Sequence, residues 1–303
     1  MKVAVLMSTY NGENFIKEQI NSILKQRGSF MLELWIRDDG SKDQTKTIIS
    51  EYAKNNQIIR WYEGENIGSA LSFIDLLIQS NEYDYYAFAD QDDVWNTDKL
   101  SRTIESIDKY NEIPALAFSN AEIVDENLNI LSSKVYKKYP KTDLYTLSCA
   151  GGILGCTMVL NRKLREIVCE CVSNNIITNE IVMHDFFVAE VCSAVGGIIT
   201  YTDYASIKYR QHNNNQIGVS SSCLEKVKGF FEDIIIPRKV SIAQQAKIVM
   251  NISAKEYCQW LERVANYKNT MLNRIQLATS RKIKCKDIHS SIKIRLSILM
   301  GNR

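Results

Sequence analysis

Apolar runs and helical stripes alternate along the first half of the chain. Residues 3–7 form a short apolar run typical of a buried strand, and residues 14–26 carry apolar side chains at helical spacing. Further strands are predicted over residues 32–37, 58–62 and 85–89, with helices over residues 43–54 and 69–79 between them. This alternation predicts an α/β fold in which a mostly parallel sheet is flanked by helices on both faces.

The second half has a less regular pattern. Strands are predicted over residues 115–118, 152–160 and 198–201, and helices over residues 162–172 and 185–194. Residues 213–222 are polar without periodicity and are interpreted as a loop that closes over a ligand. Only helices are expected after it. The predicted organisation is an α/β domain over residues 1–222 and a helical C-terminal region over residues 223–303.

Composition excludes several classes of protein. The 45% hydrophobic and 24% charged residues are ordinary for a globular protein, and the 3 prolines exclude a collagen-like or linker-rich chain. The N-terminal apolar run is too short for a signal peptide, and no stretch approaches the roughly 18 apolar residues of a membrane span. The eight cysteines lack C-x-x-C spacing. We therefore expect a cytoplasmic protein with reduced thiols.

A polar cluster follows each of the first four predicted strands. The clusters are Ser8-Thr9-Tyr10-Asn11, Asp38-Asp39-Gly40-Ser41, Glu63-Gly64-Glu65-Asn66 and Asp90-Gln91-Asp92-Asp93. Ligands of such sheets bind in a crevice at the carboxyl ends of the strands. The four clusters are therefore expected to meet in one ligand-binding crevice.

The cluster after the fourth strand carries the strongest chemical signal. Its three carboxylates, Asp90, Asp92 and Asp93, repel one another unless a cation or a proton intervenes. Oxygen ligands of this kind suit Mg²⁺ or Mn²⁺, which bridge carboxylates and substrate phosphates. An isolated acidic run is more often a solvated turn, and only the neighbouring clusters favour a site here. Asp39 could accept hydrogen bonds from a nucleobase or a ribose, and Tyr10 could stack on the base.

Taken in order, these motifs resemble those of the family-two inverting glycosyltransferases, which have the GT-A nucleotide-diphosphate-sugar binding fold. The resemblance rests on Ser8-Thr9-Tyr10-Asn11-Gly12, Asp38-Asp39-Gly40-Ser41-Lys42-Asp43, Asn66-Ile67-Gly68 and Asp90-Gln91-Asp92-Asp93-Val94-Trp95. It covers about the first 215 residues. The Asp-Gln-Asp-Asp-x-Trp variant is most similar to bacterial rhamnosyltransferases of polysaccharide synthesis.

The resemblance implies roles for particular residues. The nucleotide-sugar donor would bind at Ser8, Tyr10, Asn11, Asp39, Asn66, Gly68, Asp90, Gln91, Asp93, Trp95 and Arg210. The metal ion, Mg²⁺ or Mn²⁺, would be held by Asp92 and His212, and the acceptor would be bordered by Gly155, Cys156, Thr157 and His184. Asp185 stands where the family carries its general base. Without the resemblance, the preferred interpretation of Asp185 is a first-turn residue favoured by the helix dipole.

The implied reaction is inverting transfer of one sugar, L-rhamnose from dTDP-rhamnose, onto a saccharide acceptor in cell-surface polysaccharide synthesis. No membrane span of the kind that processive members carry is predicted in this chain. One alternative is a hexosyl or N-acetylhexosaminyl transferase that uses a UDP-sugar. Another is a scaffold that binds sugar nucleotides without turnover. A nucleotidyltransferase is disfavoured, because residues 8–12 are not a glycine-rich basic loop.

The last 37 residues are strongly basic, although the net charge of the whole chain is only +2. Ile288, Ile292, Leu296 and Leu299 share one helical face, near Lys282, Lys284, Lys286, Lys293 and Arg295. Such a helix could lie on an anionic membrane, which would suit a lipid-linked acceptor at the inner face of the plasma membrane. It could equally pack on the domain or in a homodimer. No nucleic-acid binding is expected.

Overall fold

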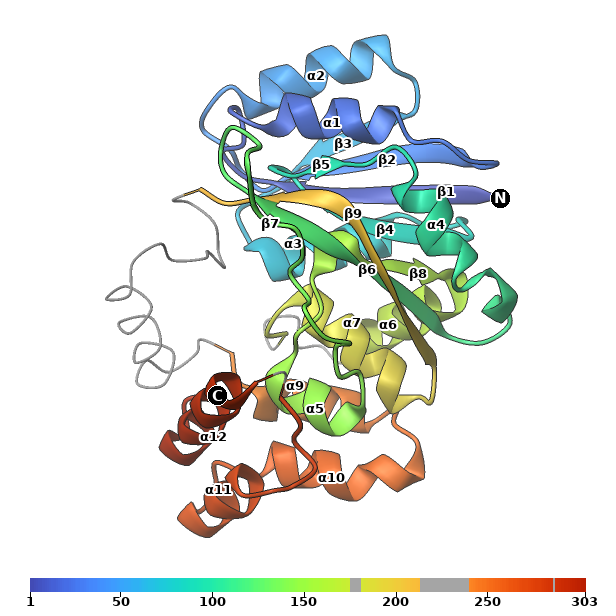
Figure 1. Ribbon diagram of the computed structural model, residues 1–303. Coiled ribbons are helices and arrows are strands. Elements are labelled where there is room, and N and C mark those ends of the chain that lie inside the picture. Colours follow the sequence, from blue (N-terminus) through green and yellow to red (C-terminus); the bar gives the residue numbers. More distant parts are fainter. Residues whose placement is uncertain (175–180, 213–239, 286) are drawn as a thin grey trace.

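The computed structural model describes residues 1–174, 181–212, 240–285 and 287–303. A central sheet carries helices on both faces, and a further group of helices from the C-terminal part of the chain packs at one end (Figure 1). No helix in the described ranges has the length and apolar character needed to cross a membrane.

The N-terminal half of the sheet is parallel, as the alternating pattern predicted. Four strands lie side by side in the order β3-β2-β1-β4. They are β1 (Lys2–Thr9), β2 (Met31–Asp38), β3 (Ile59–Glu63) and β4 (Tyr85–Asp90). Three helices connect them: α1 (Ile16–Leu24), α2 (Thr45–Asn55) and α3 (Ser69–Gln79).

Beyond β4 the sheet is mixed. Strand β8 (Val159–Asn161) pairs antiparallel with both β4 and β6 (Ala115–Val124), and β9 (Ile198–Arg210) runs parallel to β6. The short strands β5 (Val94–Trp95) and β7 (Ile130–Ser132) are antiparallel additions to β9 and β6. Strand β9 is much longer than predicted, and its end returns to the turn that follows β4.

The strand predicted over residues 152–160 is wrong for most of its length. The chain forms helix α5 (Leu144–Ala150), an irregular turn, the 3₁₀ helix η2 (Gly155–Thr157) and then the short β8. Gly151 and Gly152 have positive φ values of 64° and 114°, which no strand accommodates. The run is continuously apolar because this turn is buried against the sheet. A buried turn and a buried strand are equally apolar, so the pattern did not distinguish them.

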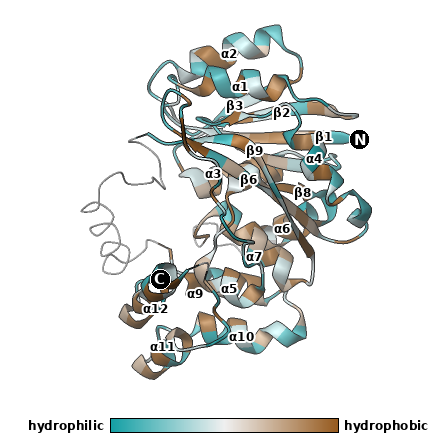
Figure 2. Ribbon diagram, in the orientation of Figure 1, coloured by the Kyte–Doolittle hydropathy of each residue, from teal (hydrophilic) through white to brown (hydrophobic). Residues whose placement is uncertain are grey.

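The two faces of the sheet separate two hydrophobic clusters. Val3, Val5 and Met7 of β1 face one cluster, which includes residues of α1, α2 and α4 (Lys99–Glu105). Ala4 and Leu6 face the other, which includes residues of α3, α6 (Arg162–Asn174) and α7 (His184–Ala194). Successive side chains of a strand point to opposite faces of the sheet, so both faces are apolar and both are covered by helices. Figure 2 shows hydrophobic residues along the strands.

Four helices follow residue 240 in the described part of the chain: α9 (Ile242–Met250), α10 (Lys255–Ala265), α11 (Met271–Ala278) and α12 (Ile288–Met300). They extend the second hydrophobic cluster. Helix α9 is joined to α7 by the Gln245 side-chain amide, which donates to the Glu190 carboxylate at 2.6 Å. The domain boundary predicted at residue 222, the closing loop over residues 213–222 and Lys286 lie outside the described residues.

Candidate active site

A cavity of about 540 Å³ opens at the carboxyl ends of β1, β2 and β4. Its lining includes these predicted residues: Ser8, Tyr10, Asn11, Asp39, Asn66, Gly68, Asp90, Gln91, Asp92, Gly155, Cys156, His184, Asp185 and His212. The structure therefore brings three of the four strand-end clusters, and Asn66 of the fourth, to one cavity. The opposite wall of the cavity consists of residues from Leu154 onward, which lie more than 60 positions after Asp92 in the sequence.

Acidic side chains converge on this cavity from both walls. Burial and the neighbouring charges of Asp92 and Asp185 raise the pKa of Asp90 to about 7. The Asp92 carboxylate lies 2.7 Å from Nε2 of His212, whose ring stacks on Phe15 at 4.9 Å between centroids. Asp92 and His212, predicted as metal ligands, are thus adjacent, and the Asp90 carboxylate shares the cavity with them.

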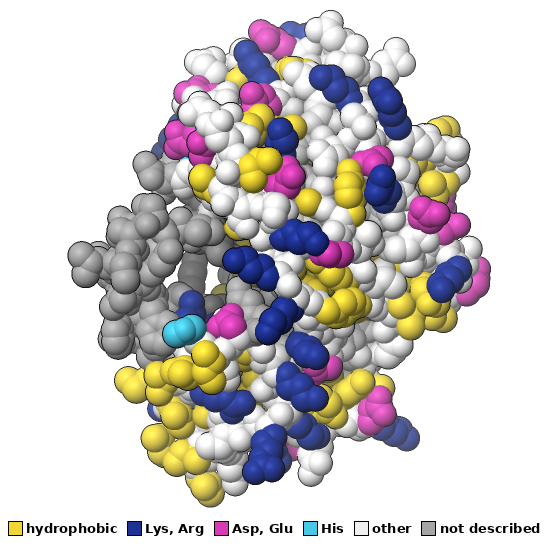
Figure 3. Space-filling model, in the orientation of Figure 1, with side chains coloured by type: hydrophobic (Ala, Val, Ile, Leu, Met, Phe, Trp, Pro, Cys, Tyr) yellow, Lys and Arg dark blue, Asp and Glu magenta, His cyan; other side chains and the backbone are white. Residues whose placement is uncertain are grey.

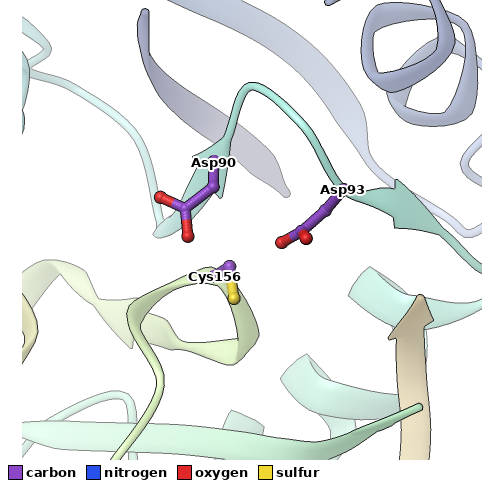
Figure 4. Close-up of side chains that lie close together, drawn as sticks. All are labelled: Asp90, Asp93 and Cys156. Atoms are coloured by element: carbon purple, nitrogen blue, oxygen red, sulfur yellow. The ribbon is translucent and has the colours of Figure 1, made fainter. Parts of the chain in front are cut away.

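Asp93 points away from this cavity into the protein. One of its oxygens accepts a hydrogen bond from the backbone N–H of Arg210 at 3.1 Å. Asp90, Asp93 and Cys156 each offer one ligand atom within 4.8 Å of the others, and Figure 4 shows the three side chains converging. Burial and the charges of Asp92 and Asp90 hold the pKa of Asp93 well above its ordinary range.

A buried lysine that sequence analysis missed lies beside this acidic group. Lys99 is fully buried, and its ammonium lies 3.5 Å from the ring centroid of Trp95. Burial lowers the pKa of Lys99 to about 7, while the charges of Cys156, Asp93 and Asp90 oppose that shift. In the sequence, the only indication that Lys99 lies near the acidic cluster was its position four residues after Trp95, at the start of a helix.

The residues around the cavity fit a divalent cation. Asp90 and Asp92 provide hard oxygen donors, and burial together with the charges of Asp92 and Asp185 raises the pKa of Asp90, so a cation would stabilise its ionised form. Asp92 and His212 would hold the ion, which would replace their mutual hydrogen bond. Cys156 is a soft ligand with a pKa held above its usual range, chiefly by burial, and suits Mg²⁺ or Mn²⁺ poorly.

The wall formed by the parallel strands is tied together by side-chain hydrogen bonds. The Gln91 amide accepts from the backbone N–H of Tyr10 at 2.9 Å and donates to the Tyr10 carbonyl at 3.1 Å. The Asp39 carboxylate accepts from the N–H groups of Ile67 at 3.0 Å and Gly68 at 2.9 Å, and it pairs with Arg37. Gln91 and Asp39 therefore shape the loops of the predicted donor pocket in addition to lining it.

Asp185 begins the opposite wall, in the first turn of α7. One oxygen of its carboxylate accepts from the backbone N–H of Phe186 at 2.6 Å, and the other from that of Gly155 at 3.2 Å. Burial raises the pKa of Asp185 to about 6. A carboxyl group with this pKa facing a cavity is suited to take a proton from a substrate near neutral pH.

His184 is held beside Asp185 by aromatic packing. Its ring stacks on Phe73 at 4.0 Å and meets Phe88 edge-on at 4.9 Å. Neither ring nitrogen has a hydrogen-bond partner within the described ranges, and burial lowers the pKa of His184 to about 3. A Cβ added to Gly155 would lie 2.5 Å from Nε2 of His184. The close approach of the η2 turn to this neutral imidazole therefore requires glycine.

Four predicted site residues do not line the cavity: Asp93, Trp95, Thr157 and Arg210. Thr157 is buried and donates to the Leu154 carbonyl, and Trp95 packs under Lys99. The Arg210 side chain is buried and pairs with Glu18, and it donates to the Asp92 carbonyl at 2.7 Å. In this arrangement, Arg210 supports the backbone of the acidic turn on the side away from the cavity.

Several lining residues were not identified from sequence: Asn14, Phe15, Ser69, Phe73, Leu154, Met183 and Tyr209. Ser69 directly follows a recognised motif and Phe15 lies three residues after another, so proximity could have suggested both. Phe73 and Met183 carry ordinary core patterns, and only the fold brings them to the cavity.

The family model described as Glycosyl transferase family 2 matches residues 4–168. The dTDP-rhamnosyl transferase RfbG of Shigella flexneri is 31% identical over 234 residues, covering 73% of this chain and 77% of that protein. The putative teichuronic acid biosynthesis glycosyltransferase TuaG of Bacillus subtilis is 28% identical over 163 residues, covering 53% of this chain and 62% of that protein.

Two solved structures support the fold. The structure of TarS residues 1–349 from S. aureus in complex with UDP-GlcNAc matches with a TM-score of 0.53 at 18% identity, covering 94% of this chain and 82% of that chain. The mannosyltransferase PcManGT from Pyrobaculum calidifontis, in complex with GDP-Man and Mn²⁺, matches with a TM-score of 0.55 at 14% identity, covering 97% of this chain and 73% of that chain.

Proposed function

This chain belongs to glycosyl transferase family 2 and has the GT-A fold, and from that premise we propose that it transfers L-rhamnose from dTDP-rhamnose to a saccharide acceptor with inversion at the anomeric carbon. The observation that carries the reaction is the single cavity in which Asp90 and Asp92 face Asp185 from opposite walls. The similarity to RfbG supports the choice of rhamnose and of the dTDP carrier. The acceptor belongs to a bacterial cell-surface polysaccharide.

In the proposed mechanism, the nucleoside binds along Ser8, Tyr10 and Asp39, and its diphosphate lies at Asp90 and Asp92. Asp92 and His212 would hold Mg²⁺ or Mn²⁺, which would supply Lewis-acid stabilisation of the departing diphosphate. The two wall residues Gly155 and His184 border the acceptor.

Asp185 is the proposed general base. It takes the proton of the acceptor hydroxyl as that oxygen forms a bond to the anomeric carbon, while the bond from this carbon to the diphosphate breaks on the opposite face. Its two backbone hydrogen bonds fix the direction in which the carboxylate points. The raised pKa makes it a better proton acceptor than an ordinary aspartate while it remains ionised above about pH 6.

Calorimetric titration of the protein with dTDP, UDP and GDP, each with and without Mn²⁺, tests the donor site. The proposal expects metal-dependent binding of dTDP ahead of the other two, followed by turnover of dTDP-rhamnose. Preference for UDP would retain a glycosyltransferase but replace the sugar donor. Absence of binding by a folded protein would contradict the donor site, and binding without any turnover would favour a scaffold.

A further inference from the structure

Exposed hydrophobic side chains gather on the last two helices. Of the 17 exposed large hydrophobic residues in the described part of the chain, seven lie on α11 and α12: Met271, Leu272, Ile275, Ile288, Ile292, Leu296 and Met300. The two helices pack against each other. Figure 3 shows hydrophobic side chains collected at the lower left, over α11 and α12, with Lys and Arg side chains beside them. We call these seven residues the C-terminal apolar patch.

The outer face of α12 is apolar although its inner face already fills the core. Ile294 and Ile298 are buried, whereas Ile288 is 68% exposed and Ile292 is 44% exposed. Ile288, Ile292, Leu296 and Met300 recur every four residues, so they share one side of the helix. Leu299, expected on this side from the sequence, is half-buried and packs against the core. A second apolar face on a helix that already has a buried face indicates a further contact.

The charges beside the patch divide into two groups. Arg295 is engaged internally, because its guanidinium donates to the carbonyls of Ala278 and Ser280 and so braces the turn after α11. Arg281 and Lys284, in the segment joining α11 to α12, have exposed side chains. Asp287 is the one acidic residue after Tyr267 in the sequence, and it accepts from the backbone N–H of Ser290 as the N-cap of α12.

These charges favour an anionic surface over a second copy of the chain as the binding partner of the patch. A two-fold interface through the patch would bring the same surface of each copy together, so the Arg281 and Lys284 side chains of both copies would enter one interface. Asp287 alone could not neutralise both sides. An anionic lipid surface complements exposed Arg and Lys side chains and also accepts apolar ones.

We propose that the C-terminal apolar patch and its flanking Arg281 and Lys284 bind the surface of an anionic membrane. The apolar side chains enter the boundary between headgroups and acyl chains, while the two cations contact lipid phosphates. The association is peripheral. It does not depend on the transferase reaction, although a lipid-linked acceptor would gain from it if the proposed function holds.

Co-sedimentation with vesicles tests this surface. The full chain is mixed with vesicles of phosphatidylcholine alone or of phosphatidylcholine with phosphatidylglycerol, without nucleotide. We expect binding to the anionic vesicles only, weakened by added salt. The double variant Ile292→Asn/Leu296→Asn should lose at least tenfold in affinity. Arg281→Gln and Lys284→Gln should each lose roughly fivefold.

The matched control is Ile130→Asn/Leu131→Asn, because these residues lie on β7 and are even more exposed, at 60% and 61% against 44% and 40% for Ile292 and Leu296. This variant should bind vesicles as the unsubstituted protein does, and the thermal transition of each variant reports its folding. No binding by the unsubstituted protein, or equal binding by the patch variant, would overturn the proposal. A dimer that the patch substitutions dissociate, without vesicle binding, would assign the face to a second copy. Calorimetric titration with the donor nucleotides involves no lipid, so its outcome does not depend on whether the patch binds a membrane.

Discussion

The two walls of the cavity are held in place by different means. On the donor wall, the side chains of Gln91 and Asp39 hold neighbouring loops through hydrogen bonds to backbone groups. On the base wall, His184 is fixed by stacking on Phe73, and no hydrogen bond of its ring is present among the described residues. The donor wall is therefore held by side-chain hydrogen bonds between its loops. On the base wall, aromatic packing holds His184, and two backbone hydrogen bonds hold Asp185. Substitutions that act on one wall at a time should separate donor binding from chemistry.

The largest effect is expected from removing the proposed base while leaving the donor wall intact. Asp185→Asn preserves the size of the side chain but cannot take up the acceptor proton. We expect kcat to fall about 10³-fold, within the 10²- to 10⁴-fold range of general-base catalysis, with unchanged affinity for dTDP. Initial rates with dTDP-rhamnose and calorimetry with dTDP provide the two measurements. A variant that retained full transfer activity would remove Asp185 from this role.

Substitution of the metal ligand should affect the donor wall instead. Asp92→Asn removes a negatively charged oxygen donor and leaves the base wall unchanged. Loss of a residue that merely orients a metal ligand lowers metal affinity about 10- to 100-fold, and loss of the ligand itself should lower it at least as much. Calorimetric titration of dTDP at several Mn²⁺ concentrations measures this effect. Equal metal dependence in the variant and the unsubstituted protein would exclude Asp92 as a ligand.

Gly155→Ala tests how far close packing against His184 maintains the base wall. The new Cβ would lie 2.5 Å from Nε2 of His184, so the ring or the η2 turn must shift. We expect destabilisation of about 1 to 3 kcal/mol, as in other overpacked interiors. The value of kcat should fall more than the affinity for dTDP. The double variant Gly155→Ala/His184→Ala provides the control, since removal of the ring should restore part of the lost stability. Additive losses in the double variant would show that the two residues do not interact.

The contrast between the walls also explains what the sequence revealed. The donor wall follows from four short motifs at the ends of parallel strands, and the parallel arrangement of these strands follows from the strand–helix alternation. The positions of Tyr10, Asp39 and Asp90 could therefore be predicted. The base wall arises where residues near 155 meet residues near 185, and nothing local in the sequence specifies that contact. Asp185 was identified only through the resemblance to a family.

Predictions failed or were incomplete where burial has more than one structural explanation. Residues 152–160 are apolar because a turn is buried there, and the pattern could not distinguish that turn from a strand. The role of Arg210 as a phosphate ligand stays a prediction, and only the fold shows that its side chain is buried beside Glu18. Lys99 sits on the ordinary stripe of a short helix, and only the fold shows its ammonium beside Trp95 and the acidic turn.

The smallest expected effect concerns pH, where activity and stability should change in opposite directions. Activity should fall as the pH drops below about 6, because protonation of Asp185 removes the base. Stability should fall as the pH rises, because burial raises the pKa of Glu190 from 4.5 to about 7 and the folded state binds its proton more tightly than the unfolded chain. The loss begins above pH 4.5 and is complete above about pH 7.

Glu190→Gln should remove this contribution, since a glutamine can still accept the hydrogen bond from Gln245 without becoming charged in the buried contact between α7 and α9. At pH 8, with metal chelated, the variant should melt about 2 to 4 °C higher than the unsubstituted protein, and at pH 4 the two should coincide. Glu166→Gln, on the exposed side of α6, is the matched control and should leave the melting curve unchanged. Because Glu190 lies outside the cavity, the pH dependence of kcat should be the same in the variant and the unsubstituted protein. A shift in that profile would mean that the buried α7–α9 contact influences Asp185, so that the base wall and the C-terminal helices respond to pH as one unit.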